Sequence, residues 1–368
     1  MSASPRRRLA SRDAGPAPVL LALCLLALAP GCAGRGLGAE AAATVLVGDQ
    51  VEVAVRDGWE RVPPGGSIPA GARVRTAASE ARLELRSGEL WLGRNAAARV
   101  DPDGIDVFRG ETLVASGGML VTRWTDVEVT GEGVYRLSPG VSPRLAVYSG
   151  TVLVRRPGEV RTLGALRQIR LATHRLPADG QPLTYRHDDP WDQELLPQAI
   201  AFDAEVEQLR RGLERQYGTA PQPPEFYLDF APPADAPSVA LLASTAEEIV
   251  PGGAFGPPAD PLVVLFVADA VSEATDQTPQ EAAEQIVALR QAGAFWGLVA
   301  TEFGVTTADL SRAVDVAQVR RVGATGAASA GRRLPRRRRH ARGDLPLFGG
   351  NHPVALRGFL GIPPASAQ

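Results

Sequence analysis

Residues able to do covalent or metal chemistry are few in this sequence and lie far apart. Its cysteines are Cys24 and Cys32, and residues 33–368 contain none. This distribution excludes a disulfide framework, a thiolate metal site and a cysteine nucleophile from the body of the chain. The histidines stand singly, at no spacing typical of metal ligands: His174, His187, His340 and His352.

The run His187-Asp188-Asp189 is the one place where imidazole and carboxylate groups adjoin. Such a run could hold a metal ion, but a polar loop is the more common structure for it. We therefore predict no metal ligand in the chain.

Two further patterns resemble fragments of an active site. Asp101, Asp103 and Asp106 are close in sequence, yet Asp-Pro-Asp-Gly at 101–104 is typical of a turn. Ser116-Gly117-Gly118 lacks the strand–turn–helix order of a nucleophile elbow. We predict no catalytic and no cofactor-binding residue and expect the chain not to be an enzyme. A cell-envelope enzyme is the minor alternative.

The N-terminus contains the residue with the clearest expected chemistry, Cys32. Arg6, Arg7, Arg8 and Arg12 precede an apolar run at 19–29. That run is too short to cross a bilayer core of about 30 Å as a helix and fits the apolar region of a signal peptide. The following Leu28-Ala29-Pro30-Gly31-Cys32 resembles a bacterial lipobox, whose cysteine becomes an acylated N-terminus. We predict a signal peptide at 1–31, lipidation at Cys32 and a tether at 32–43.

Two features depart from the lipobox pattern: Pro30 is unusual in it, and Leu28 lies one place further back than the pattern prefers. The alternative is an ordinary signal peptide that is cleaved near Ala41 or Ala43 and releases a secreted protein. Under the lipoprotein interpretation, two or more acyl chains would hold the protein stably on a membrane. We expect a periplasmic or cell-surface location.

Composition limits the partners. The net charge is −2 and aromatic residues make up 5% of the chain. The chain therefore lacks both the overall positive charge that binds phosphates and a large number of rings on which bases could stack. We expect no nucleic-acid partner. The expected partners are a membrane, reached through the N-terminal lipid, and a protein or envelope polymer.

Residues 44–175 predict a β-rich domain. Short runs alternate between apolar and polar residues, as in Ala81–Leu85 and Leu90–Leu92, with Ser87-Gly88 as a turn between them. We expect ten to twelve short antiparallel strands in a stacked or sandwich arrangement. Trp59, Trp91 and Trp124 could line a binding surface, although a Trp in a small β domain more often lies in or beside the core.

The order of motifs in this region resembles the FecR-type extracytoplasmic domain. The motifs are Ile68–Thr76, Ala81–Gly88 with Leu90–Leu92, Val107–Glu111, Val121–Leu137 and Val147–Val154. The resemblance covers roughly a third of the chain and implies a β-rich, non-enzymatic module for protein interaction or sensing.

Two departures qualify the resemblance. Gly131-Glu132-Gly133-Val134-Tyr135 keeps the turn and the aromatic residue that the family has before its last hairpin, but not its Thr. The signal sequence starts almost at residue 1, so we expect none of the cytoplasmic segment through which family members control sigma factors. We expect binding, scaffolding or sensing at the envelope. The alternative is a part in cell-surface signalling through a separate membrane partner.

The C-terminal half predicts helices. Within 190–218, one amphipathic helix is expected from about Gln193 to Tyr217, because apolar residues recur there at steps of three and four. Residues 219–260 form a Pro/Ala-rich linker that could enclose a short helix near 240–250. Residues 261–322 form a small helical module, in which Thr278-Pro279-Gln280-Glu281 predicts a capped helix start.

Within this module, residues 299–312 resemble the helix-turn-helix of DNA-binding proteins. Asp309, Arg312 and Asp315 give its second helix little of the positive charge that DNA phosphates require, so we expect a tight helix pair without DNA binding. Residues 323–368 predict a disordered, Arg-rich tail, which outside the cytoplasm would face anionic lipid or wall polymer.

Overall fold

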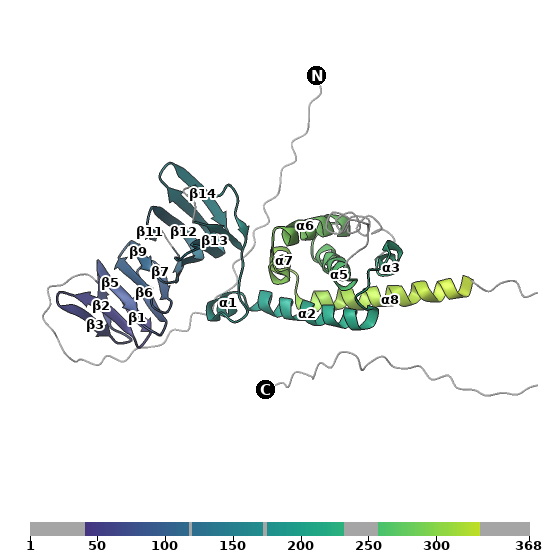
Figure 1. The fold of residues 1–368 in the computed structure, drawn as a ribbon, viewed down its shortest axis with the longest axis horizontal. Helices are drawn as coiled ribbons and strands as arrows, with labels where there is room; N and C mark the ends of the chain where they lie inside the picture. The colour runs from purple at the N-terminus through teal and green to yellow at the C-terminus, as the bar shows by residue number, and fades with distance from the viewer. Residues whose placement is uncertain (1–40, 118–119, 172–174, 232–256, 332–368) are drawn as a thin grey trace, which may run out of the picture. The chain divides into compact units, whose positions relative to one another are not determined.

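A computed structural model describes residues 41–117, 120–171, 175–231 and 257–331. It is β-rich in its first half and helical in its second (Figure 1), which confirms the predicted fold class. The chain divides into two compact units, residues 1–131 (unit 1) and 132–368 (unit 2). Cys32 and the predicted signal peptide lie outside the described residues.

Unit 1 consists of strands, including the first half of β12. The order along its sheet is β3-β2-β5-β8-β9-β11-β12-β10-β7-β6-β1-β4. The strands are β1 (Ala41–Val47), β2 (Val51–Val55), β3 (Gly58–Val62), β4 (Ser67–Pro69), β5 (Ala72–Thr76), β6 (Ala81–Leu85), β7 (Gly88–Leu92), β8 (Ala97–Asp101), β9 (Gly104–Arg109), β10 (Thr112–Ser116), β11 (Val121–Trp124) and β12 (Val127–Ser138).

Alternation along these strands forms the core of unit 1. Val53, Val74, Val100 and Val107 lie on four different strands and are fully or almost fully buried. The residues directly before and after each of them along its strand are partly or fully exposed. β6 and β7 form the predicted hairpin, with Leu83 opposite Leu90. Apolar side chains at every second position therefore lie on one side of the sheet.

Unit 2 begins with the second half of β12 and continues through β13 (Arg144–Arg156), β14 (Glu159–Gly164), β15 (Arg167–Arg170) and β16 (Gln181–Pro182). β13 pairs with β15 through its first half and with β14 through its second.

The structure corrects the predicted strands. Among the described residues, the predicted β region contains 15 strands, β1 to β15, rather than ten to twelve, and β16 lies beyond it. β9 and β11 pair in parallel rather than antiparallel. Residues 131–133 are not a turn but part of β12, because Gly133 lies against β13: a Cβ there would be 2.0 Å from the Ser149 carbonyl oxygen. Glycine at this position permits the close approach of β12 and β13, so β12 runs through the predicted turn as one long strand.

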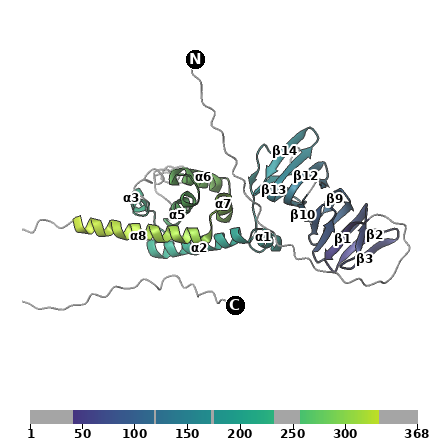
Figure 2. The ribbon, with the colours of Figure 1, turned by 180° about the vertical axis from the view of Figure 1, so that it is seen from behind.

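The described helices of unit 2 are α1 (Pro190–Leu195), α2 (Pro197–Tyr217), α3 (Pro224–Leu228), α5 (Ala259–Ala274), α6 (Pro279–Gln291), α7 (Trp296–Phe303) and α8 (Thr307–Gly331). α2 and α8 lie side by side, with the shorter helices α3, α5, α6 and α7 on one side of them (Figures 1 and 2). Phe202, Phe266, Ile286, Val299 and Leu310 are buried among them.

Three predicted helix boundaries differ from the structure. The predicted single helix at 193–217 is divided at Leu196, which ends α1 and precedes Pro197 at the first position of α2. The predicted linker contains α3, while the short helix near 240–250 lies outside the described residues. Residues 323–331, which we expected to begin the tail, continue α8. None of the described helices is long and apolar enough to span a membrane.

Candidate binding surface

The residues that could have formed a metal site make separate contacts. Asp188 pairs with Arg186 at 2.8 Å, and Asp189 pairs with Arg136 at 2.9 Å. His187 Nε2 lies 3.2 Å from the carboxylate of Asp203. The three side chains thus have different partners, and no group of three or more metal-ligating side chains occurs among the described residues.

Two of the three carboxylates at 101–106, those of Asp101 and Asp106, are likewise engaged in ion pairs. Residues 101–104 connect β8 to β9, as the turn pattern predicts. Asp101 and Asp106 both pair with Arg99, and the Asp103 carbonyl oxygen accepts from Val121 N–H at 3.1 Å. Ser116 ends a strand, β10.

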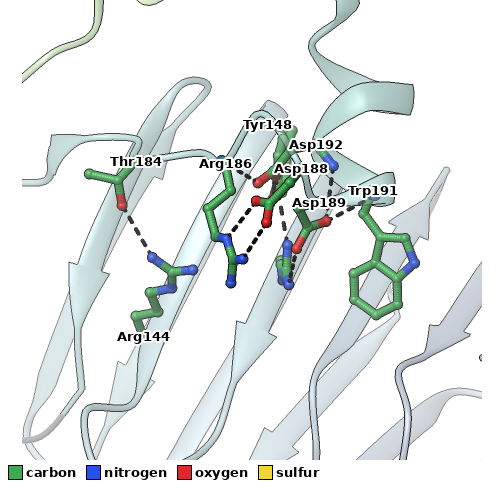
Figure 3. Close-up of polar contacts among 9 residues, drawn as sticks. Arg144, Tyr148, Thr184, Arg186, Asp188, Asp189, Trp191 and Asp192 are labelled. Atoms are coloured by element: carbon green, nitrogen blue, oxygen red, sulfur yellow. Dashed lines mark hydrogen bonds and ion pairs between the residues drawn. The ribbon is translucent and has the colours of Figure 1, made fainter. Parts of the chain in front are cut away.

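A buried polar cluster in unit 2 joins α1 to β12 and β13 (Figure 3). The Tyr148 hydroxyl donates to Asp192 at 2.5 Å, and Arg136 donates to Asp189 at 2.9 Å. Asp189 also caps α1 by accepting from the backbone N–H groups of Trp191 and Asp192. Arg136 lies 4.9 Å from the centre of the Trp191 ring.

Burial and charge shift the pKa values in this cluster in different directions. Burial raises the pKa of Tyr148, and the neighbouring carboxylate of Asp192 raises it further. Burial also raises the pKa of Asp192. For Asp189, burial alone would raise the pKa, but the hydrogen bond and positive charge of Arg136 outweigh it and lower the pKa.

The cluster is built to hold elements together. Asp192, Arg136 and Tyr148 are 2%, 5% and 6% exposed, and the hydrogen bonds described above join them to one another or to Asp189. A group that binds substrate must face space that the substrate can occupy. We therefore assign these residues to the attachment of α1.

A second polar contact attaches α7 to α2. Asp203 accepts from the Tyr185 hydroxyl and, at 2.8 Å, from Gly297 N–H. Burial first, and the Asp203 hydrogen bond second, raise the pKa of Tyr185. A Cβ on Gly297 would lie 2.0 Å from the Ala199 carbonyl oxygen, so only glycine allows this helix contact.

Unit 1 offers a different kind of surface on the outward side of its neighbouring strands β3, β2, β5, β8, β9, β11 and β12. Strand register places polar and aromatic side chains there, opposite the buried valines. We call this surface the ladder face. Its main residues are Glu52, Trp59, Arg61, Arg73, Arg75, Arg99, Asp101, Asp106, Phe108, Arg123 and Glu128.

Ion pairs run across the ladder face from strand to strand. Glu52 pairs with Arg75 at 2.5 Å, Arg99 pairs with Asp106, and Arg123 lies 3.7 Å from Asp106 and 3.4 Å from Glu128. Their side chains remain partly exposed. Exposed pairs of this kind contribute about 0–1 kcal/mol each, so their main effect is to fix the positions of charges on the surface.

Aromatic rings beside arginines complete the ladder face. Arg75 lies 4.2 Å from the ring centre of Trp59, which is 39% exposed, and Arg73 lies 5.0 Å from that of Phe108, which is 45% exposed. Of the other candidate tryptophans, Trp91 is buried beside Arg82 and Trp124 is half-buried. Trp59 and Phe108 are therefore the aromatic residues of the ladder face that are exposed to solvent.

The helical module has a shallow groove of about 580 Å³. Its lining residues are Thr275, Gln277, Gln285, Ala288, Leu289, Glu302 and Phe303. Its acidic residue, Glu302, pairs with Arg167 at 3.4 Å. The groove thus offers mostly amide, hydroxyl and apolar groups, without a pair of groups suited to acid–base catalysis.

The predicted helix-turn-helix is present as a tight helix pair. α7 ends at Gly304, in the left-handed conformation, and Thr306 and Asp309 form reciprocal hydrogen bonds at the start of α8. Arg312 lies 3.2 Å from Asp309 and 3.7 Å from Glu273. The positive charge of Arg312 is therefore already paired with carboxylates. The absence of DNA binding stays a prediction.

Sequence analysis missed an aromatic cluster between α2, α3 and α8. The guanidinium of Arg321 lies 4.4, 5.2 and 4.8 Å from the ring centres of Tyr217, Phe226 and Phe230. Burial raises the pKa of the neighbouring Tyr227 to about 12. The local signal was Phe226-Tyr227-x-x-Phe230, an aromatic group in a chain with few aromatic residues, which the surrounding Pro and Ala obscured.

Comparison with known proteins gives little. No family model matches the chain, and no curated protein matches it. Two crystal structures, at 2.50 and 1.65 Å resolution, of a candidate anti-sigma factor from Parabacteroides distasonis have 16% and 15% sequence identity. They cover 40% of this chain and 75% and 76% of their own, each with a TM-score of 0.27. A score this low supports no statement about fold or function, so the family is not established.

Proposed function

We propose that this chain is an exported, lipid-anchored protein without enzymatic activity, which binds another protein at the cell envelope through the ladder face. The observation that carries the proposal is the combination of exposed Trp59 and Phe108 with arginines held beside them. Aromatic residues and arginine are enriched in the energetically important parts of protein interfaces.

The size of the ladder face suits a macromolecule. Its seven neighbouring strands, at a spacing of about 4.8 Å, make it about 29 Å wide. A standard interface covers about 800 Å² on each partner, which needs a broad surface of this kind rather than a pocket. The face is built on strands, so its side chains are held in fixed relative positions.

The charges favour a protein over a polyanion. Glu52, Asp101, Asp106 and Glu128 are interleaved with the arginines and would repel an anionic polymer or membrane. Arg61 and Arg73 have no carboxylate within ion-pair distance in the described parts of the chain. The expected partner therefore presents carboxylates opposite Arg61 and Arg73 and apolar side chains opposite Trp59 and Phe108.

The FecR-like motifs support the same assignment. The Ile68–Thr76 motif falls on β4 and β5, and the hairpin motif at 81–92 falls on β6 and β7. We infer that the β-rich region is a FecR-like module used for binding, with Cys32 as its membrane anchor. A role in signalling through a separate membrane protein would use the same surface, and the identity of the bound protein would distinguish the two.

Photo-crosslinking in the producing bacterium tests this function. A photoreactive residue is placed at Trp59 or at Phe108, and as a control at Val160, which is 54% exposed on β14. We expect one adduct of defined mass from positions 59 and 108, none from 160, and loss of the adduct with Arg73→Glu but not with Arg94→Glu. Equal adducts at all three positions, or none at 59 and 108, would contradict the proposal.

A further inference from the structure

Two arginines of unit 2 lie directly opposite each other on neighbouring strands. Arg144 of β13 pairs in register with Arg170 of β15, and Ala146 pairs with Gln168 two residues along. Side chains two apart on a strand share a face, and directly opposed Cβ atoms are about 4.5–5.5 Å apart. The register therefore brings two positive charges together, with Gln168 beside them.

Neither arginine has a neutralising partner among the residues that the structure describes. Arg144 donates from Nη1 to the Thr184 hydroxyl at 3.1 Å (Figure 3), which is an uncharged acceptor. Arg170 is exposed and has no hydrogen bond or ion pair to a described residue. The adjoining residues 172–174 are Ala, Thr and His, so they supply no carboxylate.

Two carboxylates that follow Thr184 along the chain are bound elsewhere. Asp188 accepts from Arg186 through two hydrogen bonds, at 3.0 and 2.8 Å, and Asp189 accepts from Arg136. The sheet of unit 1 contains a comparable pair, Arg73 opposite Arg99.

That pair in unit 1 is compensated. Arg99 pairs with Asp101 and Asp106, while Arg73 lies over the Phe108 ring. Like charges directly opposite each other destabilise a sheet. The Arg144–Arg170 pair thus retains a repulsion that unit 1 relieves with its own side chains.

We propose that Arg144 and Arg170 bind a phosphate group. Two guanidinium groups carry two positive charges, which a phosphate of charge about −1.5 to −2 neutralises and a single carboxylate does not. The planar guanidinium donates two parallel hydrogen bonds to such an oxyanion. The Gln168 side-chain amide, whose oxygen accepts from Thr184 at 3.1 Å, leaves its N–H groups as further donors.

Thr184 acts as a positioning residue in this site. Its hydroxyl accepts from Arg144 and donates to Gln168, so it holds both side chains beside the exposed Arg170. The phosphate could belong to a soluble phosphate ester or to a phospholipid headgroup. This site is separate from the ladder face and does not depend on its proposed function.

Thermal unfolding tests the site with inorganic phosphate as the probe. The full chain carrying Cys32→Ser is compared at pH 7 in phosphate and in chloride of equal ionic strength. Because a ligand that binds only the folded state stabilises it, we expect phosphate to raise the Tm by about 2 °C or more. Arg170→Gln should abolish this shift and have a higher Tm in chloride, since the repulsion is relieved.

The control is Arg94→Gln, which removes one exposed positive charge from a turn of unit 1 and should keep the full shift. Arg144→Gln provides a second loss-of-binding variant. The proposal is overturned by equal Tm values in phosphate and chloride, by a shift that survives both variants, or by an equal shift in acetate, which would indicate a carboxylate site.

Vesicle sedimentation distinguishes the two sources of phosphate. The same proteins are mixed with phosphatidylcholine vesicles with and without phosphatidylglycerol. Binding to the anionic vesicles that falls at least about tenfold in Arg170→Gln, but not in Arg94→Gln, supports a headgroup ligand. A phosphate-induced Tm shift without such vesicle binding supports a soluble phosphate ester.

Discussion

Arginine has two different roles in this chain, which contains no lysine. On the ladder face, Arg75, Arg99 and Arg123 pair with carboxylates while remaining partly exposed, so each pair contributes little to stability. In unit 2, Arg136 is buried between Asp189 and Asp192, where removing one charge leaves the others without compensation. Pairs of guanidinium and carboxylate groups thus fix the positions of surface charges on the ladder face, whereas around Arg136 they hold the fold together.

Replacing Arg136 with Ala should destabilise the protein strongly. Loss of one partner from a buried ion pair costs about 3–5 kcal/mol, and Asp189 and Asp192 would both lose a cation. Urea unfolding measures the change. The matched control is Arg99→Ala on the ladder face, for which we expect a loss of about 1 kcal/mol or less. Similar losses for the two variants would contradict the assigned roles.

The Asp189 carboxylate should make stability depend on acidity. Its pKa is lowered in the folded state, so its contribution is present above the unfolded pKa of about 4 and is lost as the pH falls through the folded pKa. We expect Asp189→Asn, which keeps a side-chain oxygen for the helix cap, to be less stable by about 1–3 kcal/mol at pH 7.

Urea unfolding at pH 7 and at about pH 3 checks this dependence. The gap between wild type and Asp189→Asn should narrow at the lower pH. Asp192, whose pKa is raised, has the opposite dependence: its contribution to stability is present at low pH and is lost as the pH rises. The Asp192 side chain is present in both proteins. A gap that stays constant or widens toward low pH would show that the charge of Asp189 is not what Arg136 stabilises.

At the scale of single elements, the start of α6 was predicted to the residue. The Thr278 side chain accepts from Glu281 N–H at 3.2 Å, and the Glu281 carboxylate accepts from Thr278 N–H at 2.9 Å. Thr278→Ala should therefore destabilise the protein by about 1 kcal/mol, whereas Thr278→Ser keeps the hydroxyl and should cost much less. Thermal unfolding of both variants tests this, and equal effects would show that the hydroxyl contributes nothing.

The contact between α7 and α2 gives a contrast between two glycines. At Gly297 a Cβ would meet the Ala199 carbonyl oxygen, whereas at Gly212 of α2 nothing lies within 4 Å. We expect Gly297→Ala to destabilise the fold by about 1–3 kcal/mol through overpacking. We expect Gly212→Ala to stabilise it by about 0.5–1 kcal/mol through helix propensity. Urea unfolding gives both signs, and two stabilising substitutions would contradict the close helix contact.

Local signals were read correctly because the forces behind them act over a few residues. The capping box at Thr278 and the hairpin at Ala81–Leu92 are of this kind. The continuous β12 was missed because it depends on Gly133 meeting Ser149, which is distant in sequence.

The candidate sites were predicted less well for the same reason. Trp59 was singled out, but its partner Arg75 and the pair of Phe108 with Arg73 follow from strand register, which the sequence pattern does not specify. Arg321 reaches rings of residues 217–230 across about a hundred residues of sequence. Contacts of this range are set by tertiary packing rather than by local pattern.

At the scale of the whole molecule, the proposed binding surface lies in unit 1, while the proposed phosphate site and the helical module lie in unit 2. The proposed binding of an envelope protein presupposes that the chain leaves the cytoplasm, whereas the proposed phosphate site does not. Under the proposed function, a β-rich module held on a lipid anchor would meet its partner at the membrane surface, where tethering would raise the effective concentration of the two. Export through Cys32 is therefore the central claim.

Mass spectrometry of the mature N-terminus tests that claim most directly. The protein is isolated from the membrane fraction of the bacterium that produces it, alongside a Cys32→Ala variant. We predict an N-terminal peptide that begins at Cys32 and carries acyl chains, and a Cys32→Ala protein that retains its signal peptide or leaves the membrane. An unmodified N-terminus near residue 42, or a chain that still begins at Met1 in the cytoplasm, would contradict it.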